Sequence, residues 1–508
     1  MPSAKPKLSR KLQNVPQLQK QLKTKPEHYW IGCGETMALK LFHEMAEHVP
    51  AYKAFLHEHG INHRSIKTIS DFKTVPTINK DNYLRKYQRE DLCWDGKFAS
   101  ESWVVSTTSG STGEPFYFPR TDLQDELYAV TAELYLRENF NIQDRKTLFI
   151  DAFAMGAWIG GLFTYEAYHR IAQKGYPLTI ITPGLNKGEV ISSVKRLAAN
   201  FDQVIIGCYP PVMRDIIDLG ISEGINWSDH NLGIIFSAEG FSETFRDYVA
   251  ERGKLSNIYT SSLNHYGTVD LGTMSHETAP AIAIRRAAVD NKKLFKGIFG
   301  DVKKLPTLTQ YLPEMFYFES EDDGVICSSY SGLPLVRYDL MDHGGVKTLA
   351  QIAQAYEQQG LNLPDELARL KLTDKLWNLP FVYVYERSDF SVNLVGGVIY
   401  PEEIRAALLT APIAESLTGK FTMAVNYDKK LNPKLEVHVE MQRGKDSSNP
   451  ALKKQVEAAI VVSLLKDNSE YGSNYATYGR KLHPKITLWP YEHPRYFSGR
   501  GKQKWVEK

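Results

Sequence analysis

The chain has 508 residues, of which 43% are apolar and 24% charged, and its formal net charge is +2. This composition is typical of ordinary soluble globular proteins, and the nearly balanced charge gives no argument for nucleic-acid binding or membrane binding, so we expect neither a nucleic-acid partner nor a membrane span. Four widely separated cysteines without a C-x-x-C pair predict free thiols, and no apolar run is long enough to span a membrane, so we expect a cytoplasmic protein.

Residues 1–26 carry basic side chains and no acidic one. We interpret this segment as a solvated, partly disordered arm. Further along, apolar residues recur at helical spacing, which predicts a helix over 35–48 and a second short helix around Tyr52.

A loop rich in serine, threonine and glycine lies at 107–115, with apolar runs at 102–106 and 116–118 that predict the two strands of a hairpin. Glycines let backbone N–H groups approach an anion closely, and hydroxyls add donors, so the loop suits a polyphosphate. It lacks the lysine of a Walker loop, so on composition alone a solvent-exposed turn is the simpler alternative.

Between about 145 and 240, short apolar segments alternate with amphipathic ones. The predicted strands are 147–150, 178–181, 204–207 and 232–236, and the predicted helices are 162–172, 190–200 and 212–219, with a further predicted helix over 122–138 before this region. This alternation predicts right-handed βαβ units and a largely parallel sheet. Ligands in such sheets bind beyond the carboxyl ends of the strands.

The region after residue 236 contains several short polar motifs. The sequence here predicts a turn at Ser237-Ala238-Glu239, a helix over 242–253 and a loop over 264–270. Further on it predicts a strand-turn-strand unit over 323–342, a polar helical insert over 347–375 and a strand over 381–385.

Charge at Arg387-Ser388-Asp389 interrupts the last of these strands and predicts a domain boundary. The segments that follow predict a small α+β domain: a helix beginning at Pro401, strands over 421–427 and 435–441, and a helix over 451–465. The predicted fold class is therefore α/β. A large domain over 27–388 would hold mostly parallel sheets flanked by helices, and a small mobile α+β domain would cover 389–508.

Taken together, these motifs stand in an order that resembles the adenylate-forming ligases, which activate carboxylic acids with ATP. The set comprises the hydroxyl-rich loop, the Ser-Ala-Glu turn, Tyr-Gly-x-x-acid at 266–270, the Arg-x-Asp boundary and Gly-Lys at 501–502. Within that superfamily the segments 48–52 and 75–80 are similar to the opening of the phenylacetate–CoA ligase branch, so the resemblance implies an AMP-forming acid–thiol ligase.

The resemblance also implies a role for each matching residue. Around the β- and γ-phosphates of ATP it implies Thr108, Ser109, Gly110, Ser111, Thr112 and Gly113. Around the adenosine it implies Ser237, Ala238 and Glu239 bordering the adenine, Asn264 on its amino group, Tyr266 stacked on the ring with Gly267 beside it, and Asp342 on the ribose with Arg387 nearby.

The implied catalytic residues are Lys502, Thr112 and Asp270, with Asp270 as the Mg²⁺ ligand and Asp389 as the hinge of the small domain. A carboxylate that attacks an α-phosphorus must approach another anion, so a lysine and a metal suit this chemistry. Two positions depart from the family pattern: Asp270 replaces the usual glutamate, and Val269 replaces a serine or threonine.

For the acyl group, the resemblance implies a pocket lined by Phe153, Trp158, Gly160, Tyr209 and His265. The aromatic rings favour an aryl or arylalkyl acid, with core packing as the alternative reading.

The resemblance implies ATP, Mg²⁺ and CoA as cofactors and a small carboxylic acid as substrate. The alternatives are transfer of the acyl group to a separate acyl-carrier protein or to an amine, and a degenerate nucleotide-binding protein without activity.

Overall fold

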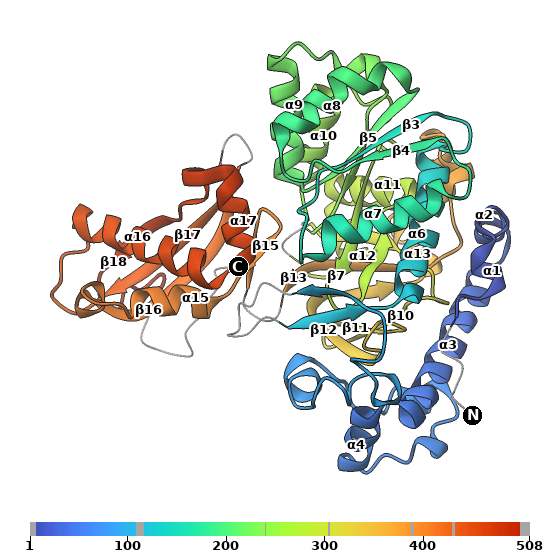
Figure 1. Ribbon diagram of the computed structural model, residues 1–508, viewed down its shortest axis with the longest axis horizontal. Helices are drawn as coiled ribbons and strands as arrows, with labels where there is room; N and C mark the ends of the chain where they lie inside the picture. The colour runs from blue at the N-terminus through green and yellow to red at the C-terminus, as the bar shows by residue number, and fades with distance from the viewer. Residues whose placement is uncertain are drawn as a thin grey trace. The chain divides into compact units, whose positions relative to one another are not determined.

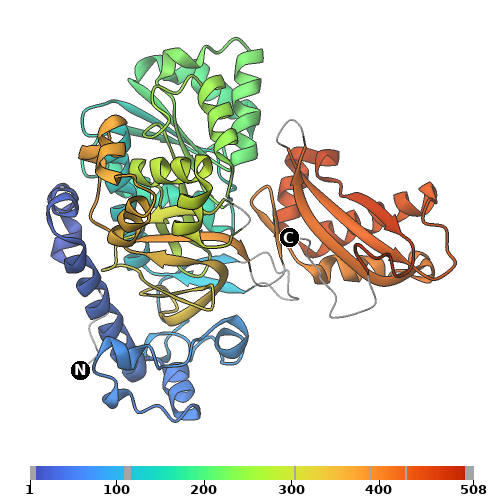
Figure 2. The same cartoon turned by 180° about the vertical axis from the view of Figure 1, so that it is seen from behind.

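The computed structural model describes residues 7–107, 116–238, 240–302, 305–387, 391–428 and 432–497 (Figures 1 and 2). The chain divides into two compact units. The first comprises Met1–Ser106, Phe118–Cys208 and Ile216–Glu386, and the second comprises Thr107–Tyr117, Tyr209–Asp215 and Arg387–Lys508.

The first unit begins with four helices: α1 (Arg10–Gln13), α2 (Val15–Thr24), α3 (Glu27–His48) and α4 (Pro50–Glu58). The prediction of a disordered arm is therefore wrong for residues 10–24. Their apolar residues Leu12, Val15, Leu18 and Leu22 recur every three or four positions and are buried, a pattern that the basic residues obscured. Helix α3 packs against β10, β11 and β12 at the edge of the unit (Figure 2).

An 11-stranded sheet forms the centre of the first unit, in the order β10-β11-β12-β13-β9-β8-β7-β6-β5-β3-β4. The strands from β4 to β7 run parallel: β3 (Thr147–Asp151), β4 (Leu178–Ile181), β5 (Gln203–Cys208), β6 (Gly233–Phe236) and β7 (Ser262–Thr268). The sequence-based prediction of parallel strands over 147–236 is confirmed. The predicted loop at 264–268 is instead the carboxyl half of β7, because pairing with β6 and β8 holds these polar residues extended.

Helices cover this parallel part of the sheet. They are α6 (Asp122–Phe140), α7 (Ile159–Ala172), α8 (Lys187–Leu197), α9 (Pro210–Ser222) and α10 (Glu243–Arg252). Helices α6 and α7 lie side by side and bury Tyr128, Tyr135 and Tyr168 against one face of β3, β5, β6 and β7 (Figure 1).

Beyond β7 the neighbouring strands run antiparallel wherever their register is defined. They are β8 (Gly272–His276), β9 (Thr307–Gln310), β10 (Tyr317–Glu321), β11 (Gly324–Ser329), β12 (Leu335–Lys347) and β13 (Phe381–Arg387). The helices α11 (Ala279–Asp290), α12 (Lys292–Phe299), α13 (Leu349–Glu357) and α14 (Leu363–Arg369) form a hydrophobic cluster with β9 and β13. The short strands β1 (Val104–Thr107) and β2 (Tyr117–Arg120) pair with each other.

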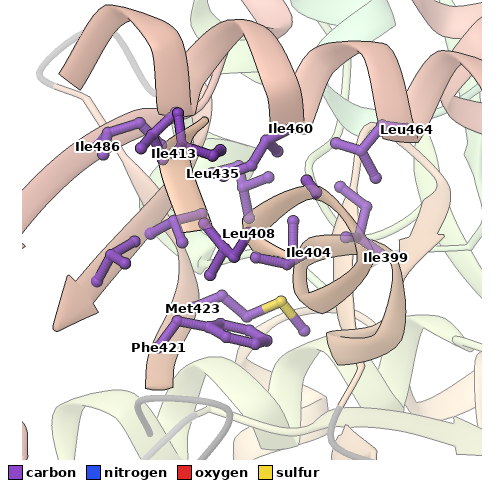
Figure 3. Close-up of a cluster of buried hydrophobic side chains, with 14 of the residues drawn as sticks. Ile399, Ile404, Leu408, Ile413, Phe421, Met423, Leu435, Ile460, Leu464 and Ile486 are labelled. Atoms are coloured by element: carbon purple, nitrogen blue, oxygen red, sulfur yellow. The ribbon is translucent and has the colours of Figure 1, made fainter. Parts of the chain in front are cut away.

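The second unit contains a three-stranded sheet, β16 (Leu417–Tyr427), β17 (Pro433–Met441) and β18 (Lys485–Trp489), and the hairpin β14 (Val392–Leu394) and β15 (Gly397–Ile399). Its helices are α15 (Pro401–Leu408), α16 (Pro450–Asp467) and α17 (Ser469–Tyr478). Side chains from all these elements share one apolar core, in which Ile404, Phe421 and Ile460 are fully buried (Figure 3).

Within the described residues, no helix is long and apolar enough to cross a membrane. The four cysteines are free, as predicted from their spacing.

Candidate active site

The carboxyl ends of the central parallel strands place the predicted adenine-binding residues next to each other. Asn264 in β7 pairs with Phe236, the last residue of β6, and Ser237 and Ala238 follow directly. Ala238 has φ of 72°, a left-handed backbone that a residue with a Cβ rarely adopts. Because such strain persists only where the surroundings enforce it, the turn marks this strand end as a functional candidate.

Two tyrosine–carboxylate hydrogen bonds tie the end of β7 to β12. The Tyr266 hydroxyl donates to Asp342 Oδ2 at 2.8 Å, and the Tyr338 hydroxyl donates to Asp270 Oδ2 at 2.5 Å. All four side chains are buried. The structure thus brings together three residues that the sequence analysis placed around the nucleotide: Tyr266, Asp270 and Asp342.

Gly267 has a structural reason in addition to its predicted role. A Cβ at this position would lie 2.6 Å from the carbonyl oxygen of Gly272, because β8 approaches closely here. A side chain would therefore push β8 away and shift the turn that carries Asp270.

A buried ionic cluster holds Asn264 from the other side. Glu277 Oε2 accepts a hydrogen bond from the Asn264 backbone N–H at 2.9 Å, and both Glu277 carboxylate oxygens lie 2.8 Å from Arg246 Nη2. Glu243 and Arg285 complete the cluster. Burial of an ion pair costs desolvation energy, so its position behind the strand is better explained by the geometry it imposes than by added stability.

The predicted acyl-pocket residues are distributed as follows. The Phe153 ring lies over Gly207, where an added Cβ would come within 2.9 Å of it, and His265 is buried under α6 beside the ring of Tyr135. Trp158 caps α7, and Gly160 is in its first turn. Tyr209 belongs to the second unit, where its ring lies against Gly396.

His265 and its neighbour His276 are held neutral. Burial lowers the pKa of His265 to about 3, with the nearby His276 adding to the effect, and burial lowers the pKa of His276 to about 4. Neither imidazole is therefore available as a cation near pH 7.

Several predicted residues lie outside the described part of the chain: the phosphate-loop residues Thr108, Ser109, Gly110, Ser111, Thr112 and Gly113, together with Glu239, Asp389 and Lys502. Arg387 ends β13, and its side chain also lies outside the description. Their roles remain predictions from the resemblance.

Comparisons with known proteins identify one similar sequence and several similar folds. A phenylacetate–coenzyme A ligase from Thermus thermophilus is 24% identical over 250 residues, which cover 47% of this chain and 52% of that ligase. The chain thus spans about half the length of the curated relative it matches. A crystal structure of 2-hydroxyisobutyryl-CoA ligase, with 2-HIB-AMP and CoA in the thioesterification state, superposes with a TM-score of 0.65 at 15% identity, covering 96% of this chain and 91% of that one.

This chain has the fold of 2-hydroxyisobutyryl-CoA ligase. An open conformation of the same 2-hydroxyisobutyryl-CoA ligase superposes with a lower TM-score, 0.53 at 14% identity, although it covers 96% of this chain and 94% of that one. No protein-family model matches the chain.

Two residues at these strand ends escaped the sequence analysis. Lys80 Nζ lies 3.4 Å from Asp270 Oδ1, although 190 residues separate the two in the chain. Asp151 ends β3 with a fully buried carboxyl group, of which Oδ1 accepts from the Phe153 N–H and Oδ2 has no hydrogen-bond partner among the described residues. Burial raises the pKa of Asp151 well above its usual range.

A local sequence signal existed for only one of them. Asp151 follows a strand that was predicted, at the strand end where ligands bind in such sheets. Lys80 carries no such signal, because only the pairing of its segment with β12 brings it to the site.

Proposed function

We propose that this protein is an ATP-dependent carboxylate–CoA ligase of the phenylacetate–CoA ligase type. A carboxylate oxygen of the acid attacks the α-phosphorus of ATP and releases pyrophosphate, giving an acyl-adenylate. The thiol of CoA then attacks the acyl carbon, loses its proton, and releases AMP.

The observation that carries this proposal is the grouping of Tyr266, Asp270 and Asp342 around the end of β7, beside Asn264 and the strained Ala238 turn. These residues are separated by up to 104 positions, from Ala238 to Asp342, yet they meet at the strand end where the resemblance expects the adenosine. In this arrangement Tyr266 both offers a ring face to the adenine and orients Asp342 toward the ribose.

The residues also fit a Mg²⁺ ion that arrives with the nucleotide. Such an ion needs one or two protein carboxylates, because phosphates and water supply its other ligands, and Asp270 is one buried carboxylate near the strand end. Among the described residues, no group of three or more His, Cys, Asp or Glu side chains could hold a metal by itself. When bound, the ion would neutralise charge on the phosphates.

For the acid, we propose an aryl or arylalkyl carboxylate. The support is the buried aromatic ring of Phe153, just after β3, and the buried, neutral His265, which together favour a flat apolar group over a charged one. We further propose a cytoplasmic enzyme, in keeping with its free cysteines, in which a separate acyl-carrier protein is the alternative acceptor to CoA.

The test is pyrophosphate release from ATP and Mg²⁺ across a panel of aryl, arylalkyl and fatty acids, each with and without CoA. Release with an aryl acid supports adenylation of this substrate class, and an acyl-CoA product identifies the acceptor. Release that stops at acyl-adenylate, with no acyl-CoA formed, would favour a carrier protein or an amine. Nucleotide binding without release for any acid would favour a degenerate, non-catalytic protein.

A further inference from the structure

Both carboxylate oxygens of Asp270 have an interaction partner. The Tyr338 hydroxyl donates to Oδ2 at 2.5 Å, and Lys80 Nζ lies 3.4 Å from Oδ1. The side chain of Asp270 is 5% exposed and that of Lys80 is 27% exposed, so the pair lies at the boundary between the core and solvent. A carboxylate in this position requires a counter-charge, and the ammonium group supplies one.

The backbone around Lys80 is held in place by β12. The Ile78 N–H donates to the Arg337 carbonyl at 3.1 Å, and the Asp339 N–H donates to the Ile78 carbonyl at 2.8 Å. The buried Arg337 side chain donates to the carbonyls of Lys73 and Val75. This segment is therefore fixed beside Tyr338, while the long side chain of Lys80 keeps several rotatable bonds.

Lys80 lies near one carboxylate and one aromatic ring. Its Nζ lies 6.0 Å from the ring centroid of Phe118 in β2. A divalent ion at Asp270 would repel the ammonium group, because both are cations at one carboxylate. The polyanion that the proposed reaction supplies is the polyphosphate of the nucleotide.

We propose that Lys80 is a phosphate-binding residue of the nucleotide site. Its ammonium group neutralises Asp270 in the ligand-free protein and contacts a phosphate oxygen when the nucleotide occupies the site, with or without the metal. The inference rests on the proposed function, since that function supplies the nucleotide. It adds a second cation to the site, contributed by the N-terminal part of the chain and not by the small domain.

The test compares Lys80→Met, which keeps an unbranched side chain without the charge, with Lys80→Arg, which keeps the charge. Lys86→Met is the matched control, because Lys86 lies in the same segment but pairs with Glu58. Isothermal titration calorimetry measures binding of ATP in EDTA, and the electron paramagnetic resonance signal of Mn²⁺ measures binding of the metal alone.

We expect Lys80→Met to weaken metal-free ATP binding about tenfold, the typical effect of one lost charge-assisted contact, and Lys80→Arg to restore it. We also expect Mn²⁺ alone to bind Lys80→Met more tightly than the unaltered protein, because a competing cation has left Asp270. Mere loss of folding would weaken both ligands, so the opposite signs exclude it. Lys86→Met should match the unaltered protein in both titrations.

The inference would be overturned if Lys80→Met bound ATP with unchanged affinity, or if it bound Mn²⁺ with unchanged or lower affinity. The proposed function would still stand in that case, provided that the unaltered protein releases pyrophosphate. Absence of both ATP binding and pyrophosphate release in the unaltered protein would overturn the proposed function and this inference with it.

Discussion

The Tyr266 hydroxyl donates a 2.8 Å hydrogen bond to Asp342 Oδ2 and thereby links β7 to β12 across 76 positions of the chain. Replacement of Tyr266 by phenylalanine keeps the aromatic face but removes this bond. We expect ATP binding to weaken by about 1 kcal/mol, or several-fold, because Asp342 loses the partner that orients it. Titration with ATP measures the effect, and Tyr311→Phe, in a ring that packs on Phe318, is the control. Equal affinity in Tyr266→Phe and the unaltered protein would contradict the orienting role.

Glu277 positions Asn264 through its backbone N–H. Glu277→Gln leaves Arg246 short of a buried counter-charge, so we expect the free energy of unfolding to fall by about 3 kcal/mol. The displaced Asn264 should raise KM for ATP more than it lowers kcat. Glu366→Gln, which breaks a surface pair with Arg369, should change stability by less than about 0.5 kcal/mol. A fall in kcat with unchanged KM in Glu277→Gln would argue against a positioning role in nucleotide binding.

Replacement of Lys502 tests the catalytic role that the resemblance implies for it. We expect Lys502→Ala to slow acyl-adenylate formation by roughly two to three orders of magnitude, the usual cost of one transition-state contact. Thioester formation from supplied acyl-adenylate should persist, because that step does not require charge on the α-phosphate to be neutralised by this lysine. Lys504→Ala is the neighbouring control. Similar loss of both half-reactions in Lys502→Ala, or loss in Lys504→Ala alone, would reassign the residue.

The buried histidines predict that stability falls in acid. His276 is neutral in the folded protein because burial lowers its pKa to about 4, whereas the unfolded chain takes up a proton below about pH 6.5. The unfolded state then binds more protons, so each such histidine removes about 2 kcal/mol of unfolding free energy between pH 7 and pH 5. Urea titrations at both pH values should show a smaller loss in His276→Gln. Replacement of the exposed His57 by glutamine is the control. If the unfolding free energy of His276→Gln falls between pH 7 and pH 5 by as much as that of the unaltered protein, His276 is not the cause of the loss.

The buried Glu403 predicts the opposite pH dependence of stability for the second unit, whose stability should fall as the pH rises. Burial raises its pKa to about 7, although Tyr400 N–H and Asn468 Nδ2 donate to the carboxylate. Between about pH 4.5 and 7 the unfolded chain releases the proton that the folded unit keeps, so stability falls as pH rises, by about 3 kcal/mol in all. Hydrogen exchange of β17 amides, corrected for intrinsic rates, measures this as an opening free energy. The fall should disappear in Glu403→Gln; if it persists there, another group causes it.

Local pattern was sufficient for the regular elements. The apolar run at 178–181 coincides with β4, and the helix expected over 242–253 is α10, with Ser242 as its N-cap. Local pattern failed where polar residues occupy a helix or a strand that tertiary contacts stabilise. The basic residues of 10–24 conceal an apolar stripe on α1 and α2, and the polar residues at 264–268 are extended only because β6 and β8 flank them.

By itself, the sequence determined the order of the motifs, the parallel strands of the central sheet and the resemblance to adenylate-forming ligases, because these depend on residues close together in the chain. Only the tertiary structure decided which side chains meet: Tyr266 with Asp342, and Lys80 with Asp270. These contacts depend on the pairing of Ile78 with Tyr338 and on the packing of β7 near β12. Neighbours in a sheet can be separated by hundreds of residues, so no local pattern specifies them.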